Sequence, residues 1–177
     1  MTVALPPRPD WSHLIKSGSR VFVGGNAGVP YALIDDLIKH SKGFSDIELV
    51  HMLALGDTRW AKEEYRQRFK VNTFFIQGDE IRRAVDEGRA DYTPVFLSEM
   101  SSLFSDGTLP LDAALVTVSP PDEFGYCSLG VSVDISMSAV RNASIAIAQI
   151  NPQMPRTAGH SFIHISEFTA CIEADEP

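Results

Sequence analysis

The sequence predicts an α/β fold in which helices flank a mainly parallel β-sheet. Short apolar, β-branched segments alternate with segments of helical period along most of the 177 residues, as in successive strand–helix units. Residues 113–119 form an apolar run bounded by prolines, which is typical of a central strand covered on both faces. Hydrophobic residues make up 44% of the chain, so a single domain of this length can bury a core of its own.

The first strand–helix unit is predicted near the amino terminus. Residues 20–23, Arg-Val-Phe-Val, have the composition of a strand. Pro30 suits the start of the following helix, and Gly43 supplies its end. Four apolar residues share one face of this helix and should cover the sheet: Leu33, Ile34, Leu37 and Ile38.

The remaining elements continue the alternation. Further strands are predicted at residues 46–53, 71–76, 91–96, 113–119 and 144–150, with a last extended run at 160–171. Helices are predicted at residues 79–88 with Asp79 as N-cap, at 98–104, and at 134–140 with Asp134 as N-cap. Residues 59–68 predict a surface helix or a long connection, and residues 122–130 a hairpin or a tight loop. The pattern predicts a Rossmann-like domain with four residues buried on central strands: Val116, Val118, Ile145 and Ile147.

Composition and charge argue against several classes of partner. The net charge is -8, and no run of lysine and arginine is present that could neutralise the phosphates of a nucleic acid. No apolar stretch reaches the roughly 18 residues of a transmembrane helix, and residues 1–7 lack the features of a signal peptide. Cys127 and Cys171 fit a reducing compartment, as small buried residues. We therefore expect a cytoplasmic protein, or one of the mitochondrial matrix, that binds neither nucleic acid nor membrane.

Residues 23–30, Val-Gly-Gly-Asn-Ala-Gly-Val-Pro, lie between the first strand and the first helix. Glycines at such a place let backbone N–H groups approach a ligand, and a helix N-terminus favours negative charge. A dinucleotide site fits less well, because the spacing is G-G-x-x-G and Glu48 falls inside a strand instead of at its end. The missing lysine excludes a P-loop. A glycine turn that only connects strand and helix is the alternative.

Residues 119–130 follow the most apolar strand, and ligands collect at the carboxyl ends of strands in open α/β sheets. Asp122 and Glu123 could form an acid/base pair, but adjacent acids in a turn rarely aim at one point, so solvated turn acids fit better. Cys127 could be a nucleophile, although no histidine is near it in the sequence. The segment is therefore a candidate wall of a site.

Residues 151–157 also follow a buried strand. Arg156 could clamp a carboxylate or a phosphate with two parallel hydrogen bonds, or it could be a solvated loop residue. His160 and His164 are four residues apart on an extended segment, with no carboxylate or cysteine placed to complete a metal site. The sequence thus predicts no metal.

Taken together, these segments resemble the acetyl-CoA hydrolase/transferase family, which includes acetate, butyrate and 4-hydroxybutyrate CoA-transferases. Each matching segment alone is only weakly specific for this family, but the order and spacing of the segments make the whole set more specific. The matching segments are residues 23–30, 90–99, 118–132 and 150–157, followed by the region of residues 164–166. They extend over nearly the whole chain.

The resemblance implies a CoA-transferase-like fold, in which two halves of the protein have different roles. Family members have two similar α/β halves, and the glutamate that carries CoA as a thioester lies in the second. Residues 1–177 would therefore be the amino-terminal half and hold no catalytic residue. The resemblance implies that these residues bind substrate: Gly24, Gly25 and Asn26 at the acyl site, Gly125, Tyr126, Ser128 and Gly130 in a neighbouring wall, and Met154 and Arg156 beside the same cleft.

The implied substrates are an acyl-CoA thioester and a short-chain carboxylate such as acetate, without a permanently bound cofactor. We expect the carboxyl-terminal domain as a partner, a homo-oligomer in full-length form, and convergence of residues 24–26, 125–130 and 154–156 at one edge of the sheet. Two alternatives stay open: an acetyl-CoA hydrolase half, in which water replaces the acceptor, and a binding module without turnover. A sugar-phosphate isomerase of similar fold has less support, because no convincing base is present.

Overall fold

The computed structural model describes residues 3–177. Its main sheet has seven strands in the order β4-β3-β2-β1-β5-β7-β9, and every neighbouring pair is parallel. The strands are β1 (Arg20–Val23), β2 (Ile47–His51), β3 (Phe69–Thr73), β4 (Ala90–Tyr92), β5 (Leu111–Val118), β7 (Ala143–Ile150) and β9 (Ala170–Glu173). The predicted α/β class with a mainly parallel sheet is confirmed.

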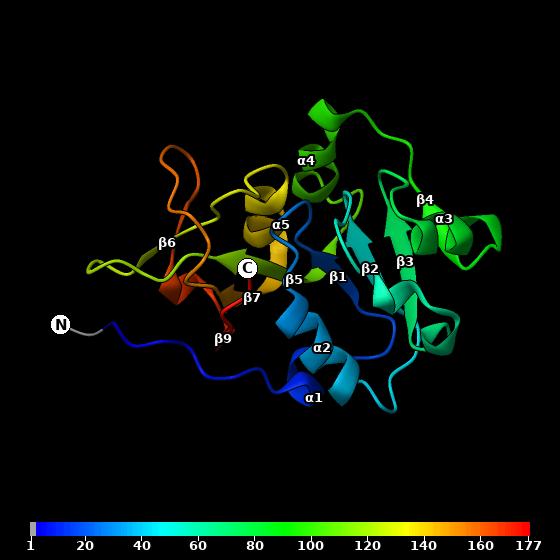
Figure 1. Cartoon of the computed structure of the whole chain (residues 1–177), viewed down its shortest axis with the longest axis horizontal. Coiled ribbons are helices and arrows are strands. Elements are labelled where there is room, and N and C mark those ends of the chain that lie inside the picture. Colours follow the sequence, from blue (N-terminus) through cyan, green and yellow to red (C-terminus); the bar gives the residue numbers. More distant parts are fainter. Residues whose placement is uncertain (1–2) are drawn as a thin grey trace.

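Helices cover both faces of this sheet. They are α1 (Trp11–Leu14), α2 (Tyr31–His40), α3 (Asp79–Asp86), α4 (Leu97–Ser105) and α5 (Ser136–Asn142), with three short 3-10 turns, η1 (Arg59–Ala61), η2 (Glu63–Tyr65) and η3 (Ile165–Glu167). Figure 1 shows α1 and α2 on one side of the sheet and α4 and α5 on the other. None of these helices, within residues 3–177, combines the length and apolar character needed to cross a membrane.

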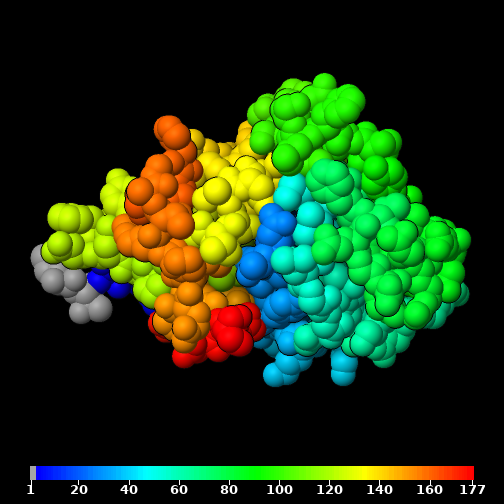
Figure 2. Space-filling view, turned by 45° about the horizontal axis from the view of Figure 1, so that its top comes forward, coloured from blue at the N-terminus to red at the C-terminus, as the bar shows by residue number. Residues whose placement is uncertain are grey.

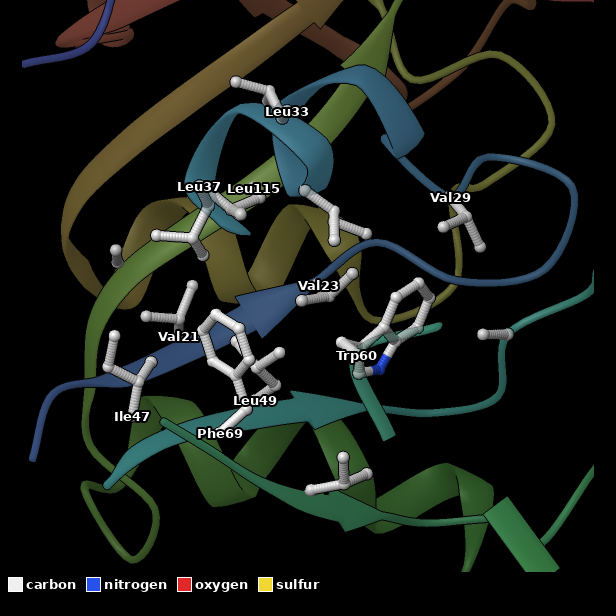
Figure 3. Close-up of a cluster of buried hydrophobic side chains, with 14 of the residues drawn as sticks. Val21, Val23, Val29, Leu33, Leu37, Ile47, Leu49, Trp60, Phe69 and Leu115 are labelled. Carbon is white, nitrogen blue, oxygen red and sulfur yellow. The ribbon is translucent and has the colours of Figure 1, made fainter. Parts of the chain in front are cut away.

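Side chains of the central strands alternate between the two faces. Val21 and Val23 of β1 belong to the core under α2, whereas Phe22 belongs to the core under α4 and α5. In the first core, Leu37 of α2 lies over the sheet beside the strand residues (Figure 3). In the second, the Phe22 ring meets the edge of the Phe104 ring at a centroid distance of 5.7 Å. Burying each such side chain contributes about 2 kcal/mol to stability, so both layers hold β1 in place.

The strand order reverses next to β1. From β1 the chain adds β2, β3 and β4 on one side, and then returns to add β5, β7 and β9 on the other. Connections that leave two adjacent parallel strands in opposite directions open a crevice outside their carboxyl ends, and this is where open α/β sheets bind ligands. The segments that follow β1 and β5 border this crevice.

A second, two-stranded sheet stands apart from the main one. β6 (Tyr126–Ser128) pairs antiparallel with β8 (Phe162–His164), as the left side of Figure 1 shows. The hairpin predicted as one possibility within residues 122–130 is therefore wrong, and a tight turn precedes β6 instead. The extended run predicted at 160–171 is interrupted by η3. Both differences arise because three-residue strands leave too short a pattern for periodicity to reveal.

Several predicted boundaries also shift. Residues 74–76 and 93–96 lie beyond the ends of β3 and β4, and the charged residues 59–68 form η1 and η2 instead of a regular helix. Gly78, with a φ of 82°, is the N-cap of α3 in place of Asp79, and Ile135 is the N-cap of α5 in place of Asp134. The short helix α1 was not predicted.

The predicted core residues are confirmed with one exception. Val116, Val118 and Ile147 are at most 1% exposed, whereas Ile145 is only partly buried near the start of β7. Both cysteines are buried and form no disulfide. Cys171 also closes the sheet edge, because its N–H donates to the Pro7 carbonyl at 2.9 Å. The amino-terminal segment thereby covers β9.

His51 ends β2 inside the protein. It is fully buried; its Nδ1 lies 3.3 Å from the Thr73 hydroxyl oxygen, and its Nε2 has no hydrogen-bond partner within the described residues. Its ring meets the Trp60 ring edge to face at a centroid distance of 6.1 Å. Burial lowers the pKa of His51 from 6.5 to about 4. The imidazole is therefore neutral in the folded protein at neutral pH.

We predict that this histidine makes stability dependent on pH. Because the pKa of His51 is depressed in the folded protein, protonation of this residue favours the unfolded state. The free energy of unfolding therefore has its full value above pH 6.5 and decreases as the pH falls towards 4. The loss amounts to about 3 kcal/mol in the free energy of unfolding. Urea unfolding between pH 4 and 7 should show a flatter profile for His51→Leu, whereas His160→Asn at an exposed position should keep the wild-type profile. Parallel profiles for His51→Leu and the wild type would contradict this.

Candidate functional site

The glycine loop, residues 24–30, is held tightly against the carboxyl ends of β2 and β5. The Gly24 N–H donates to the Leu115 carbonyl at 2.8 Å, and the Asn26 N–H donates to the Leu53 carbonyl at 3.0 Å. A Cβ atom at Gly25 would lie 2.4 Å from that same Leu53 oxygen, so no larger residue fits without moving the backbone. The close approach of two backbone segments explains why glycine is needed here.

Two backbone donors of this loop stay open. Within residues 3–177, the N–H groups of Gly25 and Ala27 donate to no protein acceptor. Ala27 is exposed, Gly25 is buried, and Asn26 between them has a φ of 54°, in the left-handed region. The exposed Ala27 N–H is therefore available to a ligand oxygen, and the binding role of the loop stays a prediction.

Ser132 and Asp134 hold the glycine loop from the opposite side. The Ser132 hydroxyl donates to the Gly25 carbonyl at 3.0 Å, and the Asn26 side-chain amide donates to Asp134 Oδ2 at 2.7 Å. The other Asp134 oxygen accepts the N–H groups of Ile135 and Ser136 at 2.6 and 3.1 Å, just before α5. One carboxylate thus connects the loop after β1 to the start of α5. Sequence analysis missed both residues as neighbours of the site.

The segment that contains Gly125 and Gly130 begins with a tight turn. Asp122 Oδ1 accepts the N–H groups of Phe124 and Tyr126 at 3.0 and 2.9 Å. The N–H of Tyr126 is the main reason why the pKa of Asp122 lies below its usual range. Gly125 has a φ of 87°, which a turn of this kind requires. Asp122 therefore stabilises the turn through its hydrogen bonds, and nothing in the structure supports an acid/base pair of Asp122 with Glu123.

Tyr126 and Ser128 lie in different environments. The Tyr126 ring is 45% exposed and meets the His164 ring edge to face at 5.1 Å. Ser128 is fully buried, and its hydroxyl oxygen accepts the N–H groups of Gly130 and Thr157, both at 3.1 Å. Only Tyr126 can contact a ligand directly, whereas Ser128 holds the segment in place.

Met154 and Arg156 brace the same segment. Met154 is buried under Gly130, where a Cβ atom would lie 2.1 Å from its sulfur. Arg156 donates to the Tyr126 carbonyl at 2.8 Å, pairs with Asp122 at 2.5 Å, and stacks over the Phe162 ring at 4.8 Å. Both terminal nitrogens of the guanidinium are therefore engaged inside the chain, which leaves little capacity to clamp a ligand.

The three predicted segments all follow parallel strands at one edge of the sheet, but only two of them contact each other directly. Residues 154–157 contact residues 126–130, while residues 132–134 contact residues 25–26. Cys127, between these segments, is fully buried, and burial raises the pKa of its thiol to about 12. It is therefore protonated at neutral pH and unsuited as a nucleophile.

A cavity of about 380 Å³ opens beside the glycine loop, and Thr117 of β5 is its most buried polar residue. Only 4% of Thr117 is exposed, and its hydroxyl has no partner within the described residues. The cavity is lined by Ala27, Val29, Tyr31, Asp35, Arg59, Thr117, Asn151, Glu176 and Pro177. It lies where the strand order reverses, at the crevice that α/β sheets use for ligands. In Figure 2 the red tail lies against the blue segment that includes this loop.

Comparisons with known proteins agree with this architecture. The family model described as the acetyl-CoA hydrolase/transferase N-terminal domain matches residues 9–177. A 4-hydroxybutyrate coenzyme A transferase from Clostridium kluyveri is 44% identical over 92% of this chain and 38% of its own length. A succinyl-CoA:acetate/propanoyl-CoA:succinate CoA transferase from Fasciola hepatica is 41% identical over 92% of this chain and 34% of its own length.

A solved structure is similar as well. The crystal structure of a 4-hydroxybutyrate CoA-transferase from Porphyromonas gingivalis has a TM-score of 0.76 and 32% identity. The match covers 94% of this chain and 38% of that chain. This chain therefore spans less than two fifths of the length of these three proteins.

We predict that Gly130→Ala destabilises the protein more than Gly107→Ala. Both glycines have a positive φ, of 59° and 76°, so both changes cost about 1 kcal/mol of backbone strain. Only at Gly130 does the new Cβ also meet Met154 and the Pro155 carbonyl. The difference in the free energy of unfolding should reach about 2 kcal/mol by urea titration. Equal losses in the two variants would show that the segment relaxes without cost.

We predict that Thr117→Val raises the free energy of unfolding by about 1 kcal/mol, because it removes a buried hydroxyl that has no partner. Thr73→Val is the matched control, since that hydroxyl is also buried but donates to the Phe75 carbonyl at 2.8 Å. The control should lower stability. If both variants lose stability equally, Thr117 has a partner in solution and the cavity contains bound water.

Proposed function

The chain belongs to the acetyl-CoA hydrolase/transferase family, and from this premise we propose that it is the amino-terminal half of an acyl-CoA:carboxylate CoA-transferase. The observation that carries the proposal is the glycine loop, which offers the open N–H groups of Gly25 and Ala27 at the crevice between β1 and β5. A second half of the same polypeptide would supply the nucleophilic glutamate. That half would face the glycine loop.

The proposed reaction proceeds through covalent intermediates. The glutamate carboxylate attacks the acyl-CoA carbonyl and expels the CoA thiolate, which leaves a mixed anhydride. The thiolate then attacks the glutamyl carbonyl and releases the first carboxylic acid as its carboxylate, which gives a glutamyl-CoA thioester. The acceptor carboxylate attacks this thioester, and the same two steps run in reverse to yield the new acyl-CoA. Each attack passes through a tetrahedral oxyanion.

This half would stabilise the oxyanion. Gly25 and Ala27 supply N–H groups, and the positive end of the α2 dipole lies immediately after the loop. Gly24 and Asn26 use their own N–H groups to fix the loop, so we assign them a supporting role. The Tyr126 ring would form the accessible part of the neighbouring wall.

The other predicted site residues would support this wall from behind. Ser128 is buried, Met154 fills the space beside Gly130, and Arg156 is paired with Asp122. None of them needs to touch the substrate for this role. We propose that they fix the position of the segment that carries Tyr126.

Three carboxylates of this half have environments that disfavour the nucleophilic role. Glu48 is paired with Arg20 at 2.6 Å and accepts from Asn72 at 3.0 Å, and it lies near the amino end of β2. Glu99 is exposed on α4. Asp134 is close to the glycine loop, but both of its oxygens accept hydrogen bonds. We therefore propose that this half alone is inactive.

The substrates are proposed from the chemistry of the relatives. The relatives are named for 4-hydroxybutyrate, succinate, acetate and propanoate, all short-chain carboxylates. We propose a donor and an acceptor of this class, a place in acetate metabolism, a full-length homo-oligomer, and no permanently bound cofactor. The reducing cytoplasm or mitochondrial matrix fits the two buried thiols. An acetyl-CoA hydrolase, in which water replaces the acceptor, is the alternative within the same site.

We predict that the complete polypeptide converts acetyl-CoA and butyrate into butyryl-CoA, whereas the 177-residue chain does not. Loss of a covalent nucleophile removes several orders of magnitude in rate. The measurement is chromatography of the acyl-CoA products, combined with mass spectrometry of the glutamyl-CoA adduct in the complete protein. Release of free CoA without butyryl-CoA would favour the hydrolase. Multiple turnovers by the 177-residue chain would show that the nucleophile lies in this half.

A further inference from the structure

The four residues after β9 are anchored to the main sheet through polar side chains of and after β7. Gln149 Nε2 donates to Glu176 Oε2 at 2.6 Å, and Asn151 Nδ2 donates to the Glu176 carbonyl at 2.8 Å. Gln153 Nε2 donates to Asp175 Oδ1 at 2.9 Å. The two part-buried bonds to Glu176 hold residues 174–177 across the carboxyl ends of β7 and β5, beside the 380 Å³ cavity, whereas the bond of Gln153 is exposed to water.

Gln149 has a second partner. Its Oε1 accepts the N–H of Leu33 in the first turn of α2 at 3.1 Å, and the whole side chain is buried. Pro30, the N-cap of α2, has no side-chain hydrogen bond of its own, so Gln149 supplies the cap from a distant strand. A single buried amide therefore joins the helix that follows the glycine loop to the tail, residues 174–177.

We propose that Gln149 is a positioning residue that sets the path of the tail relative to the glycine loop. Through the tail it sets the orientation in which the second half faces the acyl site. The proposal rests on the proposed function, since the second half is part of it. The relatives extend to more than twice the length of this chain, which leaves room for a further α/β unit after the tail.

Exposed apolar side chains indicate where that unit would lie. Among residues 3–177, ten large apolar side chains are exposed, and all but Leu5 follow a strand of the main sheet at or beyond its carboxyl end, on the side of the glycine loop. These nine are Leu55, Phe75, Tyr92, Phe96, Leu97, Phe124, Tyr126, Val131 and Val133. Apolar surface collected at one edge is typical of an interface. Because apolar burial is not directional, it cannot fix an orientation, whereas the hydrogen bonds of the tail can.

The inference is tested in the complete polypeptide by exchanging the hydrogen-bonding side chains at positions 149 and 176. Gln149→Glu keeps an acceptor for the Leu33 N–H but places a second carboxylate beside Glu176, and the two charges repel. Adding Glu176→Gln restores the bond with donor and acceptor exchanged. Glu176→Gln alone keeps an acceptor oxygen for Gln149. Gln153→Glu is the matched control, because it makes the same change beside Asp175 at an exposed position where water screens the charges.

The expected results separate positioning from folding. Gln149→Glu should lower kcat for acyl transfer about tenfold with less than a threefold change in KM, because the glutamate is misplaced while substrate contacts stay. The kcat of the double variant should return to within about threefold of the wild-type value. The kcat values of Glu176→Gln and of the control Gln153→Glu should also lie within about threefold of it. Amide hydrogen exchange should become faster in residues 174–176 of Gln149→Glu but not in β5.

Each contrary result is informative. Gln149 does not position the second half if Gln149→Glu loosens the tail while kcat stays unchanged. The same conclusion follows if the double variant restores neither kcat nor the slow hydrogen exchange of the tail. Should Gln149→Glu unfold, Glu176→Ala removes the acceptor without altering the core and must itself lower kcat. Absence of acyl transfer in the wild-type complete protein would instead refute the proposed function, and the exchange data would then decide only whether Gln149 anchors the tail.

Discussion

The position of β1 is the constraint on which the rest of this structure depends. β1 is the central strand of the sheet, with β2 on one side and β5 on the other, and both of its faces are covered by helices. The chain can leave its carboxyl end only through the narrow space between the Leu115 and Leu53 carbonyls. That space admits a segment without a side chain, which explains Gly25. The same packing leaves the loop at the crevice with open N–H groups.

Polar groups around the crevice are used mainly to join elements. Asp134 links the glycine loop to α5, Gln149 links α2 to the tail, and Arg156 links the turn at Asp122 to β6. Each of these side chains satisfies partners from two segments at once, so their geometry is fixed by hydrogen bonds on both sides. Thr117 differs, since its buried hydroxyl has no partner in the described chain, and Arg59 Nε at the same cavity also lacks a hydrogen-bond partner there. A fixed polar frame with open positions at Thr117 and Arg59 is suited to receive a ligand.

The sequence predicted the elements that have a strong local pattern. The apolar run around Val116 identified β5, and the glycines after β1 identified the loop, because each follows from steric or burial requirements of neighbouring residues. The pairing of β6 with β8 and the contact between Asn26 and Asp134 could not be predicted, since the latter partners are 108 residues apart. Gln149 did carry a signal, because a polar residue within an apolar strand requires a buried partner.

A division between two halves follows from the chemistry proposed for the site. Donors that stabilise an oxyanion lie near the plane of the reacting carbonyl, whereas a nucleophile must approach from above or below that plane. A carboxylate within this half that came close to the glycine loop would meet the same N–H groups and the positive end of α2, and these would hold it as a hydrogen-bonded anion. Asp134 contacts the loop differently, because its two oxygens accept bonds from the Asn26 side-chain amide and from N–H groups at the start of α5. A glutamate carried on a separate unit can remain unpaired until the substrate lies between it and the loop.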